Sequence, residues 1–280
     1  MIEGDYAGFN VAVQDDGVCV VTLNRPERMN GLRRAVKRDL TELAVQLAYR
    51  REVRAVVLTG GASFCAGDDV TPGAQDDWDA AASRKVHPTE HDSFATYASL
   101  RAVSQNCTRA WKNLDVLTIA AIDGFAIQSG LSLALACDFR IATPRARLGS
   151  ATLRMGYLPD EGGHHLLVQH LGVPATKDFV FRKRIVDGAE ALRLGLVNEL
   201  AEPDELMPRA LAFAAELAEG PQVAMRLLKG AIDAAAHLTF EQACADIATR
   251  TGISDHHPDA KEGVRAFAAK PRRKPNFNQA

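Results

Sequence analysis

The sequence predicts an α/β fold that ends in a helical region. Two observations lead to this prediction. Over the first part of the 280-residue chain, short β-branched runs alternate with segments whose apolar residues recur at helical spacing. From Pro174 onward the spacing is mostly helical, and Gly220-Pro221 marks a break between helices. With 47% hydrophobic residues, a chain of this length can bury a full core.

The first expected elements are two strands, a helix and a third strand. Residues 9–23 (FNVAVQDDGVCVVTL) predict two strands joined at Asp15-Asp16-Gly17, because an Asp-Gly step is a strong hairpin signal. Residues 31–50 have apolar positions at helical spacing. Residues 53–60 (VRAVVLTG) form a β-branched run typical of a strand buried on both faces.

The pattern then repeats after a change of composition. Residues 70–93 are polar and interrupted by Pro and Gly, which indicates a surface segment. Residues 94–114 predict a helix, and residues 117–124 predict another strand that ends at a glycine. A helix of small residues over 130–137 and a strand pair over 138–150 follow. Further helices are expected over residues 175–183, 187–197, 204–220, 221–238, 239–252 and 258–269.

Charge and composition exclude several function classes. The formal net charge of −2 favours neither nucleic acid nor an anionic membrane surface. The 5 cysteines are scattered without a CxxC pair, and the N-terminus shows no signal pattern. The richest apolar run, residues 116–136, is interrupted by polar residues and glycines and is a poor membrane span. We therefore expect a cytoplasmic protein that binds neither nucleic acid nor membranes.

No metal site is expected. His87, Glu90 and His91 lie in a polar, Pro-containing segment without the helical HExxH spacing that would direct two imidazoles at one ion. The glycine-rich residues 60–68 (GGASFCAGD) also lack the Lys-Ser/Thr pair of a phosphate-binding loop.

Two loops remain as candidates for a site, residues 63–69 (SFCAGDD) and 124–131 (GFAIQSGL). Each follows an apolar strand, so their backbone N–H groups can converge where two strand ends lie side by side. Two such N–H groups form an oxyanion hole, in which each donor lowers the barrier by roughly 3 kcal/mol. The site would then need no reactive side chain between Gln128 and Ala136, where the sequence has none. The alternative is that both loops are ordinary tight turns.

Five segments resemble, in order and spacing, the crotonase superfamily of enoyl-CoA hydratases, isomerases and their relatives. They are VTLNRPERMNGL, RAVVLTGGASFCAGDDV, IAAIDGFAIQSGLSLALACDFRIA, LGSATLRMGYLPDEGG and GAEALRLGLVNELAEPDEL, and the resemblance covers about residues 8–270. It implies a crotonase-like spiral of ββα units with the CoA and acyl site over residues 1–200. Residues 201–280 would form a helical region for trimerisation that also covers the pocket.

The resemblance also implies the ligand and its contacts. The substrate would be an acyl-CoA thioester, with no cofactor beyond its coenzyme A moiety, and the assembly a homotrimer or a dimer of trimers. The backbone N–H groups of Ala66 and Ser129 match the two donors that hold a thioester enolate. Residues implied to contact CoA are Arg25 and Arg28 near its phosphates, Asp69 and Val70 at its adenine, and also Ala66 and Asp68.

The reaction is indicated by four positions. Related hydratases use two glutamates to activate water and deliver a proton, but the matching positions here are Ser132 and Thr152. Hydration by that route is therefore not expected. Asp160 and Glu161 follow instead, and several isomerase and dehalogenase branches resemble this chain in having an acid at the position of Asp160. One carboxylate suffices to move a proton between C2 and C4 of an unsaturated thioester, so an enoyl-CoA isomerase with Asp160 as the proton carrier is favoured.

Alternatives remain open at this point. Asp160 or Glu161 could simply cap the helix that begins near Gly162. The site could also carry out hydratase-type, hydrolytic or dehalogenating chemistry on an aromatic or branched acyl-CoA. A third reading is an acyl-CoA binding protein without catalytic activity.

Overall fold

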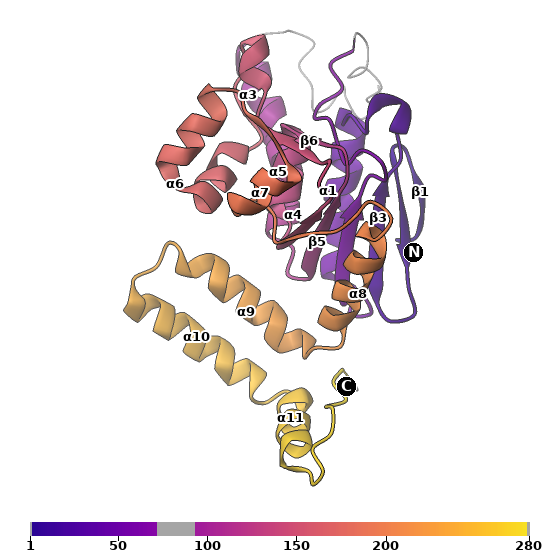
Figure 1. Cartoon of the computed structure of the whole chain (residues 1–280). Helices are drawn as coiled ribbons and strands as arrows, with labels where there is room; N and C mark the ends of the chain where they lie inside the picture. Colours follow the sequence, from indigo (N-terminus) through magenta and orange to yellow (C-terminus); the bar gives the residue numbers. More distant parts are fainter. Residues whose placement is uncertain (1, 72–92, 279–280) are drawn as a thin grey trace.

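A seven-stranded sheet forms the centre of the computed structural model, which describes residues 2–71 and 93–278 (Figure 1). The strands are β1 (Gly4–Tyr6), β2 (Phe9–Val13), β3 (Val18–Leu23), β4 (Ala55–Thr59), β5 (Leu117–Ile122), β6 (Phe125–Ile127), β7 (Phe139–Ala142), β8 (Arg147–Gly149), β9 (Ile185–Asp187) and β10 (Glu199–Leu200). Their order in the large sheet is β1-β2-β3-β4-β5-β7-β10. The pairs β1–β2 and β2–β3 are antiparallel, and the other pairs are parallel. Strands β6, β8 and β9 form a second sheet.

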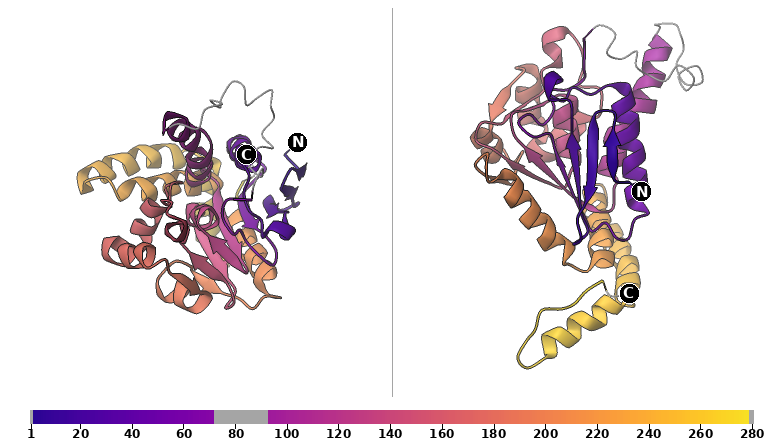
Figure 2. Two further views of the ribbon diagram at one scale, coloured as in Figure 1. Left: turned by 90° about the horizontal axis from the view of Figure 1, so that it is seen from above. Right: turned by 90° about the vertical axis from the view of Figure 1, so that its right-hand side faces the viewer.

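Helices cover the sheets and continue alone at the C-terminus (Figures 1 and 2). They are α1 (Arg34–Ala48), α3 (Ser93–Ser99), α4 (Gln105–Lys112), α5 (Ser129–Ala136), α6 (Gly163–Phe181), α7 (Gly188–Arg193), α8 (Leu206–Ala218), α9 (Gln222–Ala235), α10 (Phe240–Ser254) and α11 (Pro258–Ala268). Two short 3₁₀ helices, η1 (Pro26–Arg28) and η3 (Thr152–Met155), and a π-helical segment, η2 (Leu100–Ser104), complete them.

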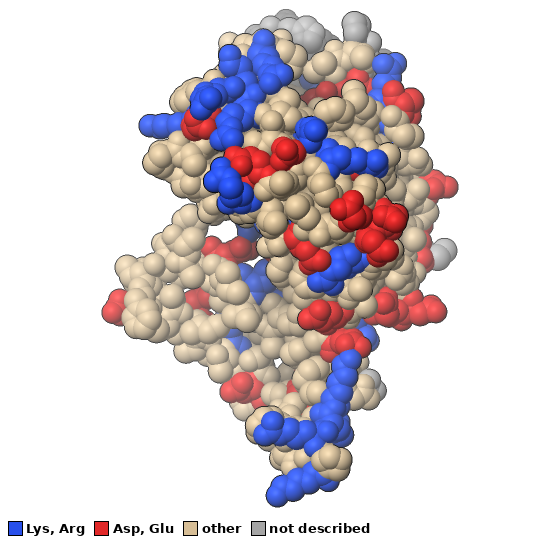
Figure 3. All heavy atoms as spheres, viewed as in Figure 1, with Lys and Arg blue, Asp and Glu red and all other residues tan. Residues whose placement is uncertain are grey.

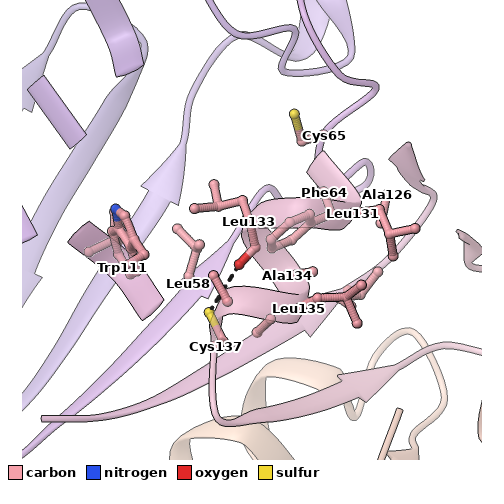
Figure 4. Packing of buried hydrophobic residues seen from close by; sticks show 14 of the residues in the cluster. Leu58, Phe64, Cys65, Trp111, Ala126, Leu131, Leu133, Ala134, Leu135 and Cys137 are labelled. Carbon is pink, nitrogen blue, oxygen red and sulfur yellow. Dashed lines mark hydrogen bonds between the residues drawn. The ribbon is translucent and has the colours of Figure 1, made fainter. Parts of the chain in front are cut away.

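The main core lies between the sheet and helices α1, α4 and α5. All five residues of β4 are buried, as the continuous β-branched run predicts for a strand covered on both faces. On α1, Leu40, Leu43 and Leu47 recur at helical spacing and are buried in this core. Every residue of α5 is buried, and Figure 4 shows its leucines packed with Leu58 and Phe64. The whole of α5 is therefore enclosed, so its N-terminus is held in a fixed position.

The opposite face of the sheet is covered by α8. Leu206, Ala210, Ala214 and Ala218 recur every four residues and pack against a second group of buried sheet residues. Helices α8 to α11 thus make up most of residues 206–268, as predicted for a helical C-terminal region, but α8 belongs to the core.

The predicted α/β class and the hairpin of β2 and β3 are confirmed. The predicted pairing within residues 138–150 is wrong. Strand β7 pairs with β5 in the large sheet, whereas β8 pairs with β6 and β9. The proline turn between them carries the chain from one sheet to the other instead of closing a hairpin. The predicted surface segment 70–93 lies almost entirely outside the described residues.

Helices α9 and α10 pack against each other and extend from the body of the molecule, with α11 beyond them (Figures 1 and 2). A groove lined by residues of α4, α6, β7 and α9 separates this pair from the body. Figure 3 shows that face hollowed there, with acidic and basic side chains intermixed over it. None of the described helices is long and apolar enough to cross a lipid bilayer.

Candidate active site

The two candidate loops lie side by side, as predicted. Cys65 and Ala126 form a parallel bridge. The Cys65 N–H donates to the Phe125 carbonyl at 2.6 Å, and the Ile127 N–H donates to the Cys65 carbonyl at 2.9 Å. Gly130 permits this approach, because a Cβ there would lie 2.3 Å from the Cys65 carbonyl oxygen. The start of α5 is therefore fixed against the loop that follows β4.

One of the two backbone donors at this junction differs from the prediction. The Ala66 N–H already donates to the Met29 carbonyl at 2.9 Å, so the assignment of Ala66 as a donor for a ligand is wrong. Asp68 bridges to Leu32 through the Gly67 carbonyl and the Asp69 N–H, which turns the Asp68 N–H to the other side. Among the described residues, the N–H groups of Asp68 and Ser129 have no acceptor. Asp68 and Ser129 thus supply two unused donors.

A buried carboxyl adjoins this pair of donors. Glu161 is 4% exposed, and one of its oxygens contacts the Ser129 hydroxyl. Its other oxygen accepts a hydrogen bond from the Gln128 side chain at 3.0 Å. The Ser129 hydroxyl also contacts the Asp68 carboxylate. The Ser129 hydroxyl therefore lies between the carboxyl groups of Asp68 and Glu161.

A buried lysine completes the cluster. Lys37 of α1 is 3% exposed, and its Nζ lies 2.7 Å from the Asp68 carboxylate and 2.8 Å from the Ser104 hydroxyl. Burial lowers the pKa of Lys37, whereas the negative charges of Asp68 and Glu161 raise it. The charges have the larger effect, so the pKa lies above its ordinary value. Lys37 is therefore a buried ammonium ion paired with Asp68. Neither Lys37 nor its pairing was predicted from the sequence.

The two predicted catalytic acids have perturbed acidities. Burial, reinforced by the negative charge of Asp68, raises the pKa of Asp160 and of Glu161, while Lys37 lowers both. The two carboxyls interact with each other, and no other described side chain hydrogen-bonds the Asp160 carboxyl. Its backbone carbonyl accepts from Gln105 at 2.9 Å. Glu161 is thus held by the side chains of Gln128 and Ser129, and Asp160 is the less restrained of the pair.

The alternative that either acid caps α6 has no support. The N-cap residue of this helix is Gly162, with φ of 91°, and neither acid accepts a cap hydrogen bond from its first turn within the described part of the chain.

The positions of the two missing glutamates hold neutral groups. Ser132 is 2% exposed and faces Gly163, while the Thr152 hydroxyl donates to the Gln128 side-chain carbonyl at 3.2 Å. The Ser150 hydroxyl donates to the same oxygen at 3.3 Å. Gln128 has φ of 50° and ψ of −110°, a strained backbone for a residue with a side chain. Its amide therefore links Thr152 and Ser150 to Glu161.

The predicted CoA contacts divide into two groups. The prediction that Arg25 binds a CoA phosphate is wrong. The Arg25 guanidinium is buried and donates to the Asp69 carboxylate at 2.9 Å and to the Gly31 carbonyl at 2.6 Å. Asp69 is likewise buried in this ion pair. Arg28 and Val70 are exposed beside it, and their contact with CoA stays a prediction.

The motif of His87, Glu90 and His91 lies outside the described residues. Over residues 2–71 and 93–278, no group of three His, Cys, Asp or Glu side chains could hold a metal ion.

Comparison with known proteins identifies the family. The family model described as enoyl-CoA hydratase/isomerase matches residues 14–280. The chain belongs to the enoyl-CoA hydratase/isomerase family. It is 30% identical over 267 residues to the short-chain-enoyl-CoA hydratase of Clostridium acetobutylicum, covering 93% of this chain and 95% of that protein. It is 33% identical over 272 residues to the mitochondrial methylglutaconyl-CoA hydratase of Rattus norvegicus, covering 92% and 78%.

The fold agrees with this membership. A crystal structure of an enoyl-CoA hydratase from Bacillus anthracis superposes with a TM-score of 0.84 at 26% identity, over 98% of this chain and 100% of that one. The predicted crotonase-like fold with its helical C-terminal region is therefore confirmed. The protein is an enzyme of the enoyl-CoA hydratase/isomerase family.

Proposed function

We propose that this protein shifts a double bond in an enoyl-CoA thioester through an enolate, with Asp160 carrying the proton. The observation that supports the proposal most strongly is the placement of the acid pair. Glu161 contacts Ser129, which contacts Asp68, and these two residues offer the two unused backbone donors. Asp160 interacts with Glu161. The positions that carry hydratase glutamates hold Ser132 and Thr152 instead.

The Asp68 and Ser129 N–H groups form the proposed oxyanion hole. They would bind the thioester oxygen as negative charge develops there, each lowering the barrier by roughly 3 kcal/mol. The close packing at Gly130 and the Cys65–Ala126 bridge fix the positions of these backbone donors. The donors therefore need no reorganisation during the reaction.

Asp160 would act first as a base and then as an acid. Ionised Asp160 removes a proton from C2 of a 3-enoyl thioester, and the electron pair of that C–H bond moves into a dienolate whose oxygen lies in the hole. The protonated Asp160 then returns the proton to C4, which leaves a 2-enoyl thioester. One carboxyl completes this cycle, and its raised pKa brings its acidity closer to what both steps need.

The relatives named above are hydratases, and hydration is the second candidate. In this chain hydration would have to proceed without carboxylates at positions 132 and 152. The two reactions are separated by assaying the purified protein with a 3-enoyl-CoA and with a 2-enoyl-CoA. The proposal expects isomerisation of the first and little addition of water to the second.

Three other outcomes would contradict the proposal. Rapid hydration of the 2-enoyl-CoA without isomerisation would favour hydratase chemistry. Turnover only with an aromatic or branched acyl-CoA, accompanied by a covalent acyl-enzyme, would favour hydrolysis or dehalogenation. Tight binding of CoA thioesters without any turnover would favour a non-catalytic binding protein.

We also propose that the protein assembles as a homotrimer or a dimer of trimers through its C-terminal helices. Large apolar side chains are exposed along these helices, which is unusual for a surface that faces water alone. They are Leu228, Ile232, Phe240, Ile247, Ile253, Val264 and Phe267.

A further inference from the structure

We infer that Lys37 is a positioning residue of the oxyanion hole, which neutralises Asp68 and thereby keeps the hole able to accept negative charge. In this arrangement the proton shared within the cluster resides on Glu161. The inference rests on the oxyanion hole of the proposed function, but not on the identity of the reaction.

The ion pair is buried on the lysine side. The Lys37 side chain is 4% exposed and the Asp68 side chain 36% exposed, with 2.7 Å between the ammonium and the carboxylate. An unpaired ammonium in such a place would be strongly unfavourable, so the pair must act as a unit. The Ser104 hydroxyl accepts a second hydrogen bond from Lys37 and holds the ammonium in place.

A count of hydrogens places the shared proton. The Ser129 hydroxyl contacts both the Asp68 and the Glu161 carboxyl, yet it has one hydrogen to donate. One contact must therefore use a proton on a carboxyl. Asp68 accepts from an ammonium, whereas Glu161 has no ion-pair partner among the described residues. Glu161 thus shares its proton with Ser129, and its interaction with the Asp160 carboxyl likewise requires a proton on the acid pair. Ser129 and Lys37 both donate to Asp68.

Acidity supports the same assignment. Burial raises the pKa of Glu161, and the charge of Asp68 raises it further. The other titratable groups that face the cluster are Asp160, whose pKa is also raised, and the thiols of Cys65 and Cys107, whose pKa values are about 12. Both thiols are therefore neutral near pH 7 and add no charge.

The consequence concerns the charge that an enolate would meet. The carboxylate of Asp68 belongs to the residue whose N–H is one of the two donors. Without Lys37, this carboxylate would repel a negative thioester oxygen at the hole. With Lys37 in place the pair is neutral, and the two N–H groups dominate the field.

The test uses a 3-ketoacyl-CoA, whose enolate absorbs in the near ultraviolet and whose ionisation on the protein reports the charge at the hole. Lys37→Met should raise the pKa of the bound ketoacyl thioester by about one unit, which is about tenfold less enolate at a given pH. Affinity for a saturated acyl-CoA should change less than twofold. Lys37→Arg is the matched control. It keeps the positive charge, so the pKa of the bound ketoacyl thioester should stay near its value in the unsubstituted protein.

Asp68→Asn tests the same claim with the opposite sign. This variant keeps the backbone N–H but leaves the ammonium uncompensated, so the pKa of the bound thioester should fall. The double variant Lys37→Met with Asp68→Asn should return towards the unsubstituted value. These two variants also keep the test decisive if Lys37→Met does not fold.

An unchanged enolate pKa in folded Lys37→Met, or a rise in Asp68→Asn, would overturn the inference. A shift as expected in a protein that does not isomerise 3-enoyl-CoA would support the inference and contradict the proposed reaction. No enolate on the unsubstituted protein would overturn the oxyanion hole and this inference together.

Discussion

The Ser129 hydroxyl contacts the Glu161 carboxyl directly, although 32 residues separate them along the chain. Ser129 begins helix α5, and Glu161 lies just before helix α6. The contact joins the proposed donor of the oxyanion hole to the acid pair that would carry the proton. It places the electrostatic and the acid–base parts of the site in one buried network.

The pH dependence of isomerisation should reflect the acid pair. Burial and the charge of Asp68 raise the pKa of Asp160, and its ionised form is the base in the first step. The rate should therefore rise with pH over a range above the ordinary aspartate pKa of about 3.9. Steady-state kcat/KM measured against pH would show it. A rate already at its plateau below pH 4 would contradict the prediction.

Replacing Arg25 should destabilise the fold. Arg25→Ala removes the nearest ion-pair partner of the buried Asp69 carboxylate and leaves Arg33 at 3.9 Å, so the free energy of unfolding is expected to fall by about 1–3 kcal/mol at neutral pH. Denaturant unfolding would measure the change, with Arg28→Ala as the matched exposed control, expected within about 0.5 kcal/mol.

The effect of Arg25→Ala should also depend on pH. Burial alone would raise the pKa of Asp69, but hydrogen bonds from Thr71 and Arg25 lower it to about 2. Because this value lies below the unfolded pKa of about 3.9, the stabilisation is present above that pH and is lost as the pH falls through 2. The difference between the two proteins should therefore narrow in acid. A constant difference would contradict the ion-pair account.

Gly130→Ala should disrupt the junction of the two loops. The added Cβ would lie 2.3 Å from the Cys65 carbonyl oxygen, which forces the two backbones apart. A loss of about 1–3 kcal/mol in the free energy of unfolding is expected, together with loss of enolate binding. Gly252→Ala in α10 is the control, because nothing lies within 4 Å of the position that its methyl group would take and alanine favours helix. Equal stability of the two variants would contradict the close packing at Gly130.

The C-terminal helices should carry the contacts between subunits. The unsubstituted protein is expected to have three or six times the 30.2 kDa mass of one chain in light scattering. Ile232→Glu combined with Phe240→Glu should reduce that mass to one chain, because charge would replace exposed apolar side chains. Val45→Glu on α1 is an exposed control that should leave the assembly intact. A monomeric unsubstituted protein would contradict the prediction.

The large elements of the fold could be predicted because their signals are local. The β-branched run of β4 and the leucine spacing of α1 determine a buried strand and the helix that covers it. The partner of β8 could not be predicted in this way, because sheet membership depends on strands β6 and β9 that are distant in sequence.

Within the candidate site, the position of the two loops could be predicted from the sequence. The convergence of two glycine-rich turns follows from two parallel strands that end at the same edge. Which N–H remains unused depends on the Leu32 bridge and on the Met29 carbonyl, so Ala66 could not be distinguished from Asp68. Lys37 lies beside the apolar stripe of α1, where a lysine normally faces water, and its partner is 31 residues away.

The central claim is that Asp160 transfers a proton at a site where hydration does not occur. Its most direct test is the rate of 3-enoyl-CoA isomerisation by Asp160→Asn, compared with the unsubstituted protein at equal occupancy of substrate. The account predicts a loss of roughly 10²–10⁴-fold in kcat with the affinity for saturated acyl-CoA unchanged. Full isomerase activity in folded Asp160→Asn would contradict it.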